Sequence, residues 1–106
     1  MTDQPTYLIA NLAITDPGGY QAYAQGFMPL LLRHGGELLA VDEKSETQEG
    51  STVLTGRVVI VKFPTEAQAR SWYGDADYQA LCVHRRAASH AQFVTLVHGL
   101  PTSRPA

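Results

Sequence analysis

The heptapeptide RVVIVKF, residues 57–63, decides the fold of this 106-residue chain. Its β-branched and aromatic side chains favour an extended backbone, and Pro64 ends the segment, so we expect a strand here. Successive side chains of a strand point to opposite faces of a sheet. The apolar run 58–61 therefore places apolar groups on both faces, whereas a sheet with one wet face would alternate apolar with polar residues. The pattern predicts a sheet covered on both sides.

The N-terminal third predicts a strand followed by a helix. Residues 7–14 (YLIANLAI) are apolar and of strand length. Asp16 can accept hydrogen bonds as an N-cap, and Pro17 suits the first helical position. Apolar side chains then recur at helical spacing as far as His34, where the glycine pair 35–36 supplies a left-handed stop. We expect a helix between these two signals.

The rest of the chain predicts two further strands, one before and one after residues 57–63. A short strand is expected over 37–41, and a strand over 90–97 closes the domain. Residues 42–56, between the strands expected over 37–41 and 57–63, are polar and contain glycines. We expect a loop here, with a strand continuation near 47–49.

The helical segment between the last two strands has clear start and stop signals. Thr65 and Gln68 form a capping box in which each can satisfy the other's free amide. Gly74 stops this helix after Tyr73, and Asp75 can start another helical turn through Tyr78.

The resulting order is strand, helix, strand, strand, helix, strand. This order predicts an α+β fold, the ferredoxin-like βαββαβ arrangement, with a four-stranded antiparallel sheet and both helices on one face. The simplest cover for the second apolar face is the same sheet of another copy, so we expect a homodimer packed sheet to sheet. The domain is expected over 7–99, with an extended or disordered segment at 1–6 and a flexible tail at 100–106.

Composition excludes several classes of partner. The formal net charge is −2, from 8 basic and 10 acidic residues, and no basic stripe is present, so nucleic acid is not expected. No apolar run approaches the roughly 20 residues that span a bilayer, so no membrane segment is expected either. The N-terminus lacks the features of a signal peptide, and Cys82 is the one cysteine. These features predict a cytoplasmic protein.

From about Tyr7 to Gly99, the sequence resembles the bacterial domain-of-unknown-function family 1330. The resemblance rests on several short matches in a fixed order: Asp16-Pro17 with Tyr20 and Tyr23, His34-Gly35-Gly36, Glu49-Gly50, Phe63-Pro64, and Tyr73 with Tyr78-Gln79-Ala80-Leu81 and Arg85. Trp72 and Arg86 depart from the pattern. The resemblance implies a dimeric α/β barrel, in which two ferredoxin-like sheets pack face to face. It implies no reaction. The wider group of such barrels includes cofactor-free monooxygenases, isomerases, dehydratases and haem-binding enzymes, by analogy of fold alone.

Arg85 is the first candidate for binding a ligand. If residues 75–86 are helical, Tyr78, Cys82 and Arg85 share one face, while Arg86 lies about 100° further round and is solvated. A guanidinium on an inward face needs an anion, and a ligand carboxylate matches its two-pronged geometry. The alternative is an internal partner, which would be a helix-end carbonyl or one of the carboxylates of Asp75, Asp77 and Glu66.

His34 and Asn11 are polar residues at positions that could border a pocket. His34 ends the long helix, where it could act as a general base or could cap the terminal carbonyls. Asn11 is the polar side chain of an apolar strand, on the face expected to meet the second copy. A buried amide must be hydrogen-bonded. It is therefore either a pocket donor or a contact across the sheets.

The aromatic residues Trp72 and Tyr78 could wall a pocket for a small apolar acid, or could be plain core. The histidines 84, 90 and 98 lack the spacing of a metal site, and no phosphate-binding glycine loop occurs, so no metal and no cofactor are expected. We therefore expect a small cytoplasmic homodimer that binds a small organic acid between sheet and helices. The alternatives are a cofactor-free enzyme of monooxygenase or isomerase type, with His34 as base, and a non-catalytic structural dimer.

Overall fold

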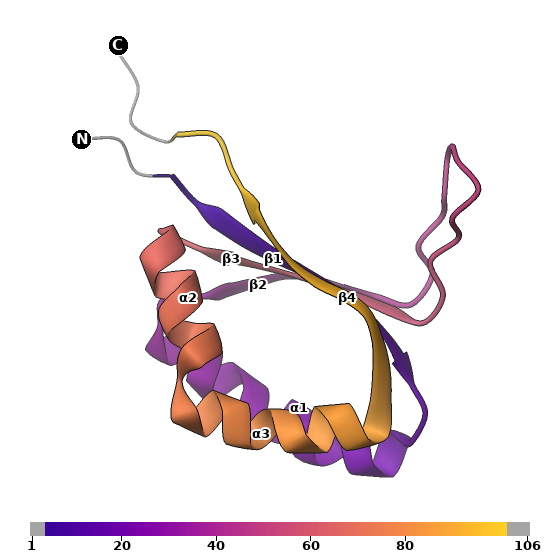
Figure 1. Cartoon of the computed structure of the whole chain (residues 1–106), viewed down its shortest axis with the longest axis horizontal. Coiled ribbons are helices and arrows are strands. Elements are labelled where there is room, and N and C mark those ends of the chain that lie inside the picture. The colour runs from indigo at the N-terminus through magenta and orange to yellow at the C-terminus, as the bar shows by residue number, and fades with distance from the viewer. Residues whose placement is uncertain (1–3, 102–106) are drawn as a thin grey trace.

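One face of a four-stranded antiparallel sheet is covered by helices, and the other carries none (Figure 1). The computed structural model describes residues 4–101. Its elements, in chain order, are β1 (Thr6–Ile14), α1 (Pro17–Arg33), β2 (Glu37–Asp42), β3 (Arg57–Phe63), α2 (Glu66–Gly74), α3 (Ala76–Ala88) and β4 (Ser89–His98). The sheet order β2-β3-β1-β4 confirms the predicted ferredoxin-like arrangement. Its second helical segment is divided into α2 and α3.

The central strand β1 fixes which side chains meet the helices. Leu8 lies opposite Val61 of β3 and Leu96 of β4, and all three belong to the core beneath the helices or pack against it. The alternate residues point the other way, so Ile9 opposite Ile60 lies on the face without helices. Apolar side chains thus occupy both faces of the sheet, as the run 58–61 predicted.

The start of α1 differs from its prediction. Asp16 occupies the N-cap position and Pro17 the first turn, but the Asp16 side chain accepts no capping hydrogen bond. The backbone N–H groups of Thr15 and Asp16 both donate to the carbonyl oxygen of Ala88, at 2.8 and 3.0 Å. The entry to α1 is therefore held by the end of α3 rather than by a capping carboxylate.

The predicted stop of α1 and the predicted caps of α2 and α3 are largely confirmed. Gly35 has φ +75°, the left-handed conformation expected after His34. The Thr65 hydroxyl accepts a hydrogen bond from the Gln68 N–H, which is one half of the capping box. The other half is wrong, because the Gln68 side-chain oxygen accepts from the Thr65 hydroxyl and not from the Thr65 backbone N–H, while its amide nitrogen donates to the carbonyl oxygen of His34. Asp75 caps α3 by accepting from the N–H of Asp77 at 2.8 Å.

The segment between β2 and β3 is a loop throughout, so the predicted strand continuation near 47–49 is wrong. Gly50 and Gly56 both have positive φ, and the Thr47 hydroxyl donates locally to the Thr52 carbonyl. In Figure 1 the loop extends beyond the sheet, away from the helices. Its far end returns to β1, where Gly56 lies against the Leu12 carbonyl too closely for any Cβ.

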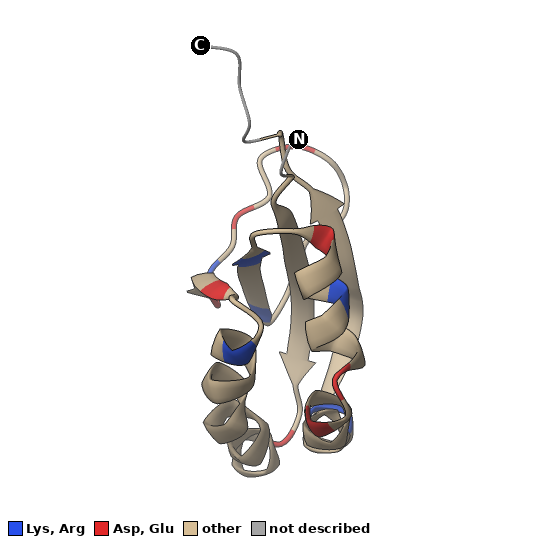
Figure 2. Cartoon of the chain, turned by 90° about the vertical axis from the view of Figure 1, so that its left-hand side faces the viewer, with Lys and Arg blue, Asp and Glu red and all other residues tan. Residues whose placement is uncertain are grey.

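The two ends of the described chain lie together. β1 begins at Thr6, one residue earlier than predicted, and the Gly99 N–H donates to the Pro5 carbonyl at 2.7 Å. The predicted N-terminal segment and tail fall partly on residues 1–3 and 102–106, which lie outside the described residues. Between residues 4 and 101, no helix is long and apolar enough to cross a membrane. Figure 2 shows acidic and basic residues interspersed over the helices and loops.

Candidate functional site

A cavity of about 190 Å³ lies between the sheet and the helices. All four strands and all three helices contribute to its wall: Leu8, Ala10, Leu12, Tyr20, Tyr23, Ala24, Phe27, Met28, Leu38, Val41, Arg57, Val59, Trp72, Tyr78, Arg85 and Val94. The wall is largely apolar, with a few polar groups, which is the usual character of a small-molecule site. A roughly 150 Å³ apolar cavity already accommodates benzene. This one therefore has room for a single ring with a small substituent.

Arg85 brings a positive charge to this cavity. Its position on α3 places it with Tyr78 and Cys82 on the buried face, as predicted, and only 6% of its surface is exposed. Its guanidinium carbon lies 5.8 Å from the ring centre of Tyr23, within the range of a cation–π contact. The neighbouring Arg86 is exposed and donates to the Gln79 side chain. Of the adjacent pair, only Arg85 faces inward.

The carboxylates predicted as internal partners of Arg85 are engaged elsewhere. Asp75 binds His34 and Arg33, Asp77 binds Arg33, and Glu66 binds Arg70 and His98. Within residues 4–101, no ion pair includes Arg85, and its side chain donates to no carbonyl. The internal-partner alternative is therefore not what the structure shows. Arg85 is a nine-tenths buried cation that lines a cavity without a protein anion beside it.

Two tyrosine hydroxyls meet at the same cavity. The hydroxyls of Tyr23 and Tyr78 are 2.7 Å apart and buried. Burial raises the pKa of both phenols above their usual value, so both are neutral at physiological pH. When one hydroxyl donates to the other, the second keeps a hydrogen for another acceptor. The pair can therefore offer one donor to a ligand.

Trp72 contributes to the wall from α2. Its side chain is 1% exposed and its ring centre lies 4.1 Å from that of Tyr78. The indole N–H is buried and has no acceptor among the described residues. A buried donor without an acceptor is costly. Trp72, Tyr78 and Arg85 are the three predicted site residues that the structure brings together at the cavity.

Arg57 lines the same cavity and was missed at the sequence level. Its guanidinium carbon lies 5.4 Å from the ring centre of Tyr20, and its outer nitrogen reaches Glu43 at 3.3 Å. Its Nε is buried and has no acceptor among the described residues. The period of two along β3 carries the missing signal, because Arg57 shares the inward face with Val59 and Val61.

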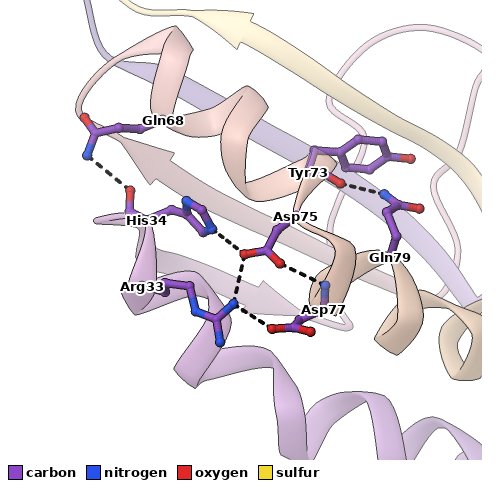
Figure 3. Close-up of polar contacts among 7 residues, drawn as sticks. All are labelled: Arg33, His34, Gln68, Tyr73, Asp75, Asp77 and Gln79. Atoms are coloured by element: carbon purple, nitrogen blue, oxygen red, sulfur yellow. Dashed lines mark hydrogen bonds and ion pairs between the residues drawn. The ribbon is translucent and has the colours of Figure 1, made fainter.

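His34 lies outside the cavity wall. Figure 3 shows its ring directed at Asp75, with Nε2 2.7 Å from the carboxylate, and only 19% of the His34 side chain is exposed. Because an ionised carboxylate is only an acceptor, the His34 ring donates in this bond. The bond, together with the Asp77 N–H and Arg33, lowers the pKa of Asp75 to about 2.

The contacts around His34 tie the end of α1 to the junction of α2 and α3 (Figure 3). Arg33 binds Asp75 at 3.0 Å and Asp77 at 2.9 Å. The backbone carbonyl of His34 accepts from Gln68. The ring therefore bonds a carboxylate rather than the terminal carbonyls that the capping alternative required.

Asn11 also lies outside the cavity wall. It is fully buried, and its amide nitrogen donates to the backbone carbonyls of Thr55 and Arg57, at 2.9 and 3.2 Å. The side chain was predicted either as a pocket donor or as a contact across the sheets. The structure shows a contact within one sheet, from β1 to the start of β3. Asn11 thus holds the backbone that carries Arg57.

The described residues contain no group of three or more histidine, cysteine, aspartate or glutamate side chains placed to hold a metal ion. Cys82 is a buried free thiol on the inward face of α3. The polar groups at the cavity are therefore the two guanidinium groups, the tyrosine hydroxyls and the Trp72 indole. None of the wall residues is a carboxylate, a lysine or a histidine.

Comparison with known proteins agrees with this fold. The family model of the domain of unknown function DUF1330 matches residues 5–100, nearly the whole described chain. The chain belongs to the DUF1330 family. No curated protein matches this DUF1330 chain significantly.

Solved structures of similar fold include two of the RPA0582 protein of unknown function from Rhodopseudomonas palustris. One is 20% identical, with a TM-score of 0.70, and covers 97% of this chain and 87% of that chain. The other, of the methylated protein, is 19% identical, with a TM-score of 0.67, over 97% and 85%. SnoaB, a cofactor-independent oxygenase from Streptomyces nogalater, is 14% identical, with a TM-score of 0.62, over 98% and 96%. Similarity at this level of identity shows the fold alone.

Proposed function

We propose that this DUF1330 protein binds a small organic acid in the cavity between sheet and helices, with Arg85 as the anion-binding residue. The observation that carries the proposal is the burial of Arg85 without a carboxylate partner among the described residues. Burying an unpaired charge is expensive. A ligand carboxylate would offset that cost through two parallel charge-assisted hydrogen bonds.

The rest of the cavity wall favours a compact, apolar body for the ligand. The volume of about 190 Å³ suits one ring or a short branched chain. Trp72 and Tyr78 supply aromatic surface, and the Tyr23–Tyr78 pair can donate one hydrogen bond beside Arg85. Benzoate combines these features and is the simplest probe for the site.

The test is benzoate binding by isothermal titration calorimetry, with Arg85→Met as the variant and Arg86→Met as the matched control. A hydrogen bond to a charged group contributes about 1.5–3 kcal/mol, so Arg85→Met should weaken binding by roughly tenfold to a hundredfold. Arg86→Met removes the same charge from the exposed side of α3 and should leave the affinity unchanged. Equal affinity in both variants, or no binding by the wild-type protein, contradicts the proposal.

We also propose that the functional unit is a cytoplasmic homodimer formed through the sheet face that carries no helices. Ile9 and Ile60 lie opposite each other on that face, and Tyr7 lies opposite Val97, which is 42% exposed. Monomeric proteins rarely leave large apolar areas exposed to water. The buried free thiol of Cys82 fits a reducing compartment.

A second candidate function is a cofactor-free enzyme. It is supported by the shared fold with a cofactor-independent oxygenase and by the pairing of His34 with Asp75, which would orient the ring as a base. The position of His34 outside the cavity wall weighs against it. If the protein only binds an acid, or is only a structural dimer, His34 takes part in no reaction. Loss of a detected turnover in His34→Ala, with benzoate affinity retained, would favour the enzyme.

A further inference from the structure

The cavity has two cationic points rather than one. Arg57 starts β3 and Arg85 lies in the last turn of α3, so the two guanidinium groups enter from the sheet and from the helical layer. Each lies over a different tyrosine of α1: Arg57 over Tyr20 at 5.4 Å and Arg85 over Tyr23 at 5.8 Å. Because the two tyrosine ring centres are 5.4 Å apart, the arginines lie over successive rings of one aromatic row.

Arg57 is only partly used by the protein itself. Its one carboxylate contact is Glu43, at 3.3 Å, and the Glu43 side chain is 61% exposed in the loop after β2. An exposed ion pair of this kind contributes little. The Arg57 Nε is buried and has no acceptor among the described residues. The second outer nitrogen of the Arg57 guanidinium has no hydrogen-bond partner among the described residues, so it retains donors for a further anion.

The backbone under Arg57 is held firmly enough to act as a fixed recognition point. The buried amide of Asn11 donates to the Arg57 carbonyl and to that of Thr55. Gly56 lies against the Leu12 carbonyl in a conformation, φ +81°, that favours glycine. A site on a pre-organised strand loses less free energy on binding than one on a mobile loop.

The polar groups of the wall are mostly donors. Arg85 and Arg57 present N–H groups, and only the tyrosine hydroxyls can also accept. A ligand with a single carboxylate would satisfy Arg85 and leave Arg57 with only its contact to the exposed Glu43. A ligand with two separated acceptor groups satisfies both.

We infer that the cavity selects small acids that carry a second anionic group, and that Arg57 binds this second group while Arg85 binds the first. The inference rests on the proposed binding of an organic acid at Arg85, and it adds the class of ligand: compact dianions, such as a dicarboxylate on one ring. The structure thereby assigns to Arg57 a role in specificity.

The experiment compares benzoate with its three dicarboxylate analogues, phthalate, isophthalate and terephthalate, by calorimetry at neutral pH. The best of the three should bind the wild-type protein at least about tenfold more tightly than benzoate, because it adds a charge-assisted hydrogen bond. In Arg57→Met the advantage of the dicarboxylate over benzoate should shrink to within about twofold, because the variant lowers the dicarboxylate affinity more than the benzoate affinity. Arg57→Gln, which keeps donors without the charge, is the second variant, should Arg57→Met fail to fold.

The outcomes separate this inference from the proposal beneath it. If benzoate binds and no dicarboxylate binds more tightly, or if the gain survives in the Arg57 variants, the dianion inference is overturned and the Arg85 site stands. If neither benzoate nor any dicarboxylate binds, the acid-binding proposal itself fails. An Arg57→Gln variant that loses affinity for benzoate and for the dicarboxylate by the same factor would also contradict the division of roles between the two arginines.

Discussion

Arg85 brings a positive charge to a cavity wall made mainly of apolar side chains. Its direction can be predicted from the sequence, but its partners cannot. The spacing of Tyr78, Cys82 and Arg85 predicts that the guanidinium lies on the buried face, because helical periodicity fixes relative direction. What it meets there depends on residues distant in sequence. The commitment of Asp75 to His34 and Arg33, more than 40 positions away, could not be predicted from local pattern. Asp75 is shown not to be the partner of Arg85 only once the fold is known.

The free energy of unfolding should respond to Arg85 in a way that separates a ligand site from a structural one. Replacing a buried, unpaired guanidinium by a similarly sized apolar group is neutral or stabilising. We expect the Tm of Arg85→Met to stay within about 5 °C of wild type in the absence of ligand. Thermal denaturation followed by circular dichroism measures this. A drop of more than about 10 °C would indicate a structural partner for Arg85.

For Arg57 and Asn11, the sequence predicts the strand that carries the residue but not what its side chain meets. Arg57 was assigned to a strand but not to a cavity, because the sequence does not say which strand face meets the helices. Once Val59 and Val61 are known to face inward, the alternation places Arg57 with them. Asn11 was recognised as a buried amide that needs partners. Its partners, the Thr55 and Arg57 carbonyls, come from a loop that returns to β1, and local pattern does not reveal that return.

Elements whose signals are local were predicted well. The strand over 57–63, the stop at Gly35 and the N-cap at Asp75 all depend on residues within a few positions. The failures involve competition from elsewhere in the chain. The Gln68 side chain accepts from the Thr65 hydroxyl and donates to the end of α1, and the entry to α1 is bonded to the end of α3.

The junction between α1, α2 and α3 should make stability depend on pH through Asp75. Its folded-state pKa of about 2 lies below the ordinary 3.8, so the ionised carboxylate stabilises the fold. That contribution is complete above about pH 4 and is lost as the pH falls through about 2. Asp75→Asn keeps the helix cap but loses the charge. The Tm of Asp75→Asn should therefore lie below that of the wild type near neutral pH, and the difference should shrink as the pH falls toward about 2.

Asp77→Asn is the matched control for that measurement, because Asp77 loses only an exposed contact with Arg33. Exposed pairs contribute little, so its Tm should follow the wild type throughout. A Tm difference for Asp75→Asn that does not change between about pH 6 and about pH 2 would contradict the role assigned to the His34–Asp75 bond.

At the scale of the whole molecule, the sheet face without helices is the feature that the single chain leaves unexplained. The apolar run of β3 predicts cover on both faces, and the helices supply it on one. We expect a homodimer by analytical ultracentrifugation at micromolar concentration. Ile60→Lys places a charge on an inner strand of that face and should weaken dimerisation by at least about tenfold, because burying an unpaired charge is costly.

Val83→Lys is the control for the dimer, because Val83 is 61% exposed on α3 and lies on the helical side. It should sediment as the wild type does. A wild-type protein that sediments as a monomer would contradict the proposed assembly, and so would an Ile60→Lys protein that dimerises as tightly as the wild type.

The most direct test of the acid-binding proposal is a crystal structure of the protein grown with benzoate. The account predicts a benzoate ring in the cavity between sheet and helices, with its carboxylate at hydrogen-bond distance, about 2.7–2.9 Å, from the Arg85 guanidinium. Arg85 paired with a protein carboxylate, with benzoate absent from the cavity, would contradict it.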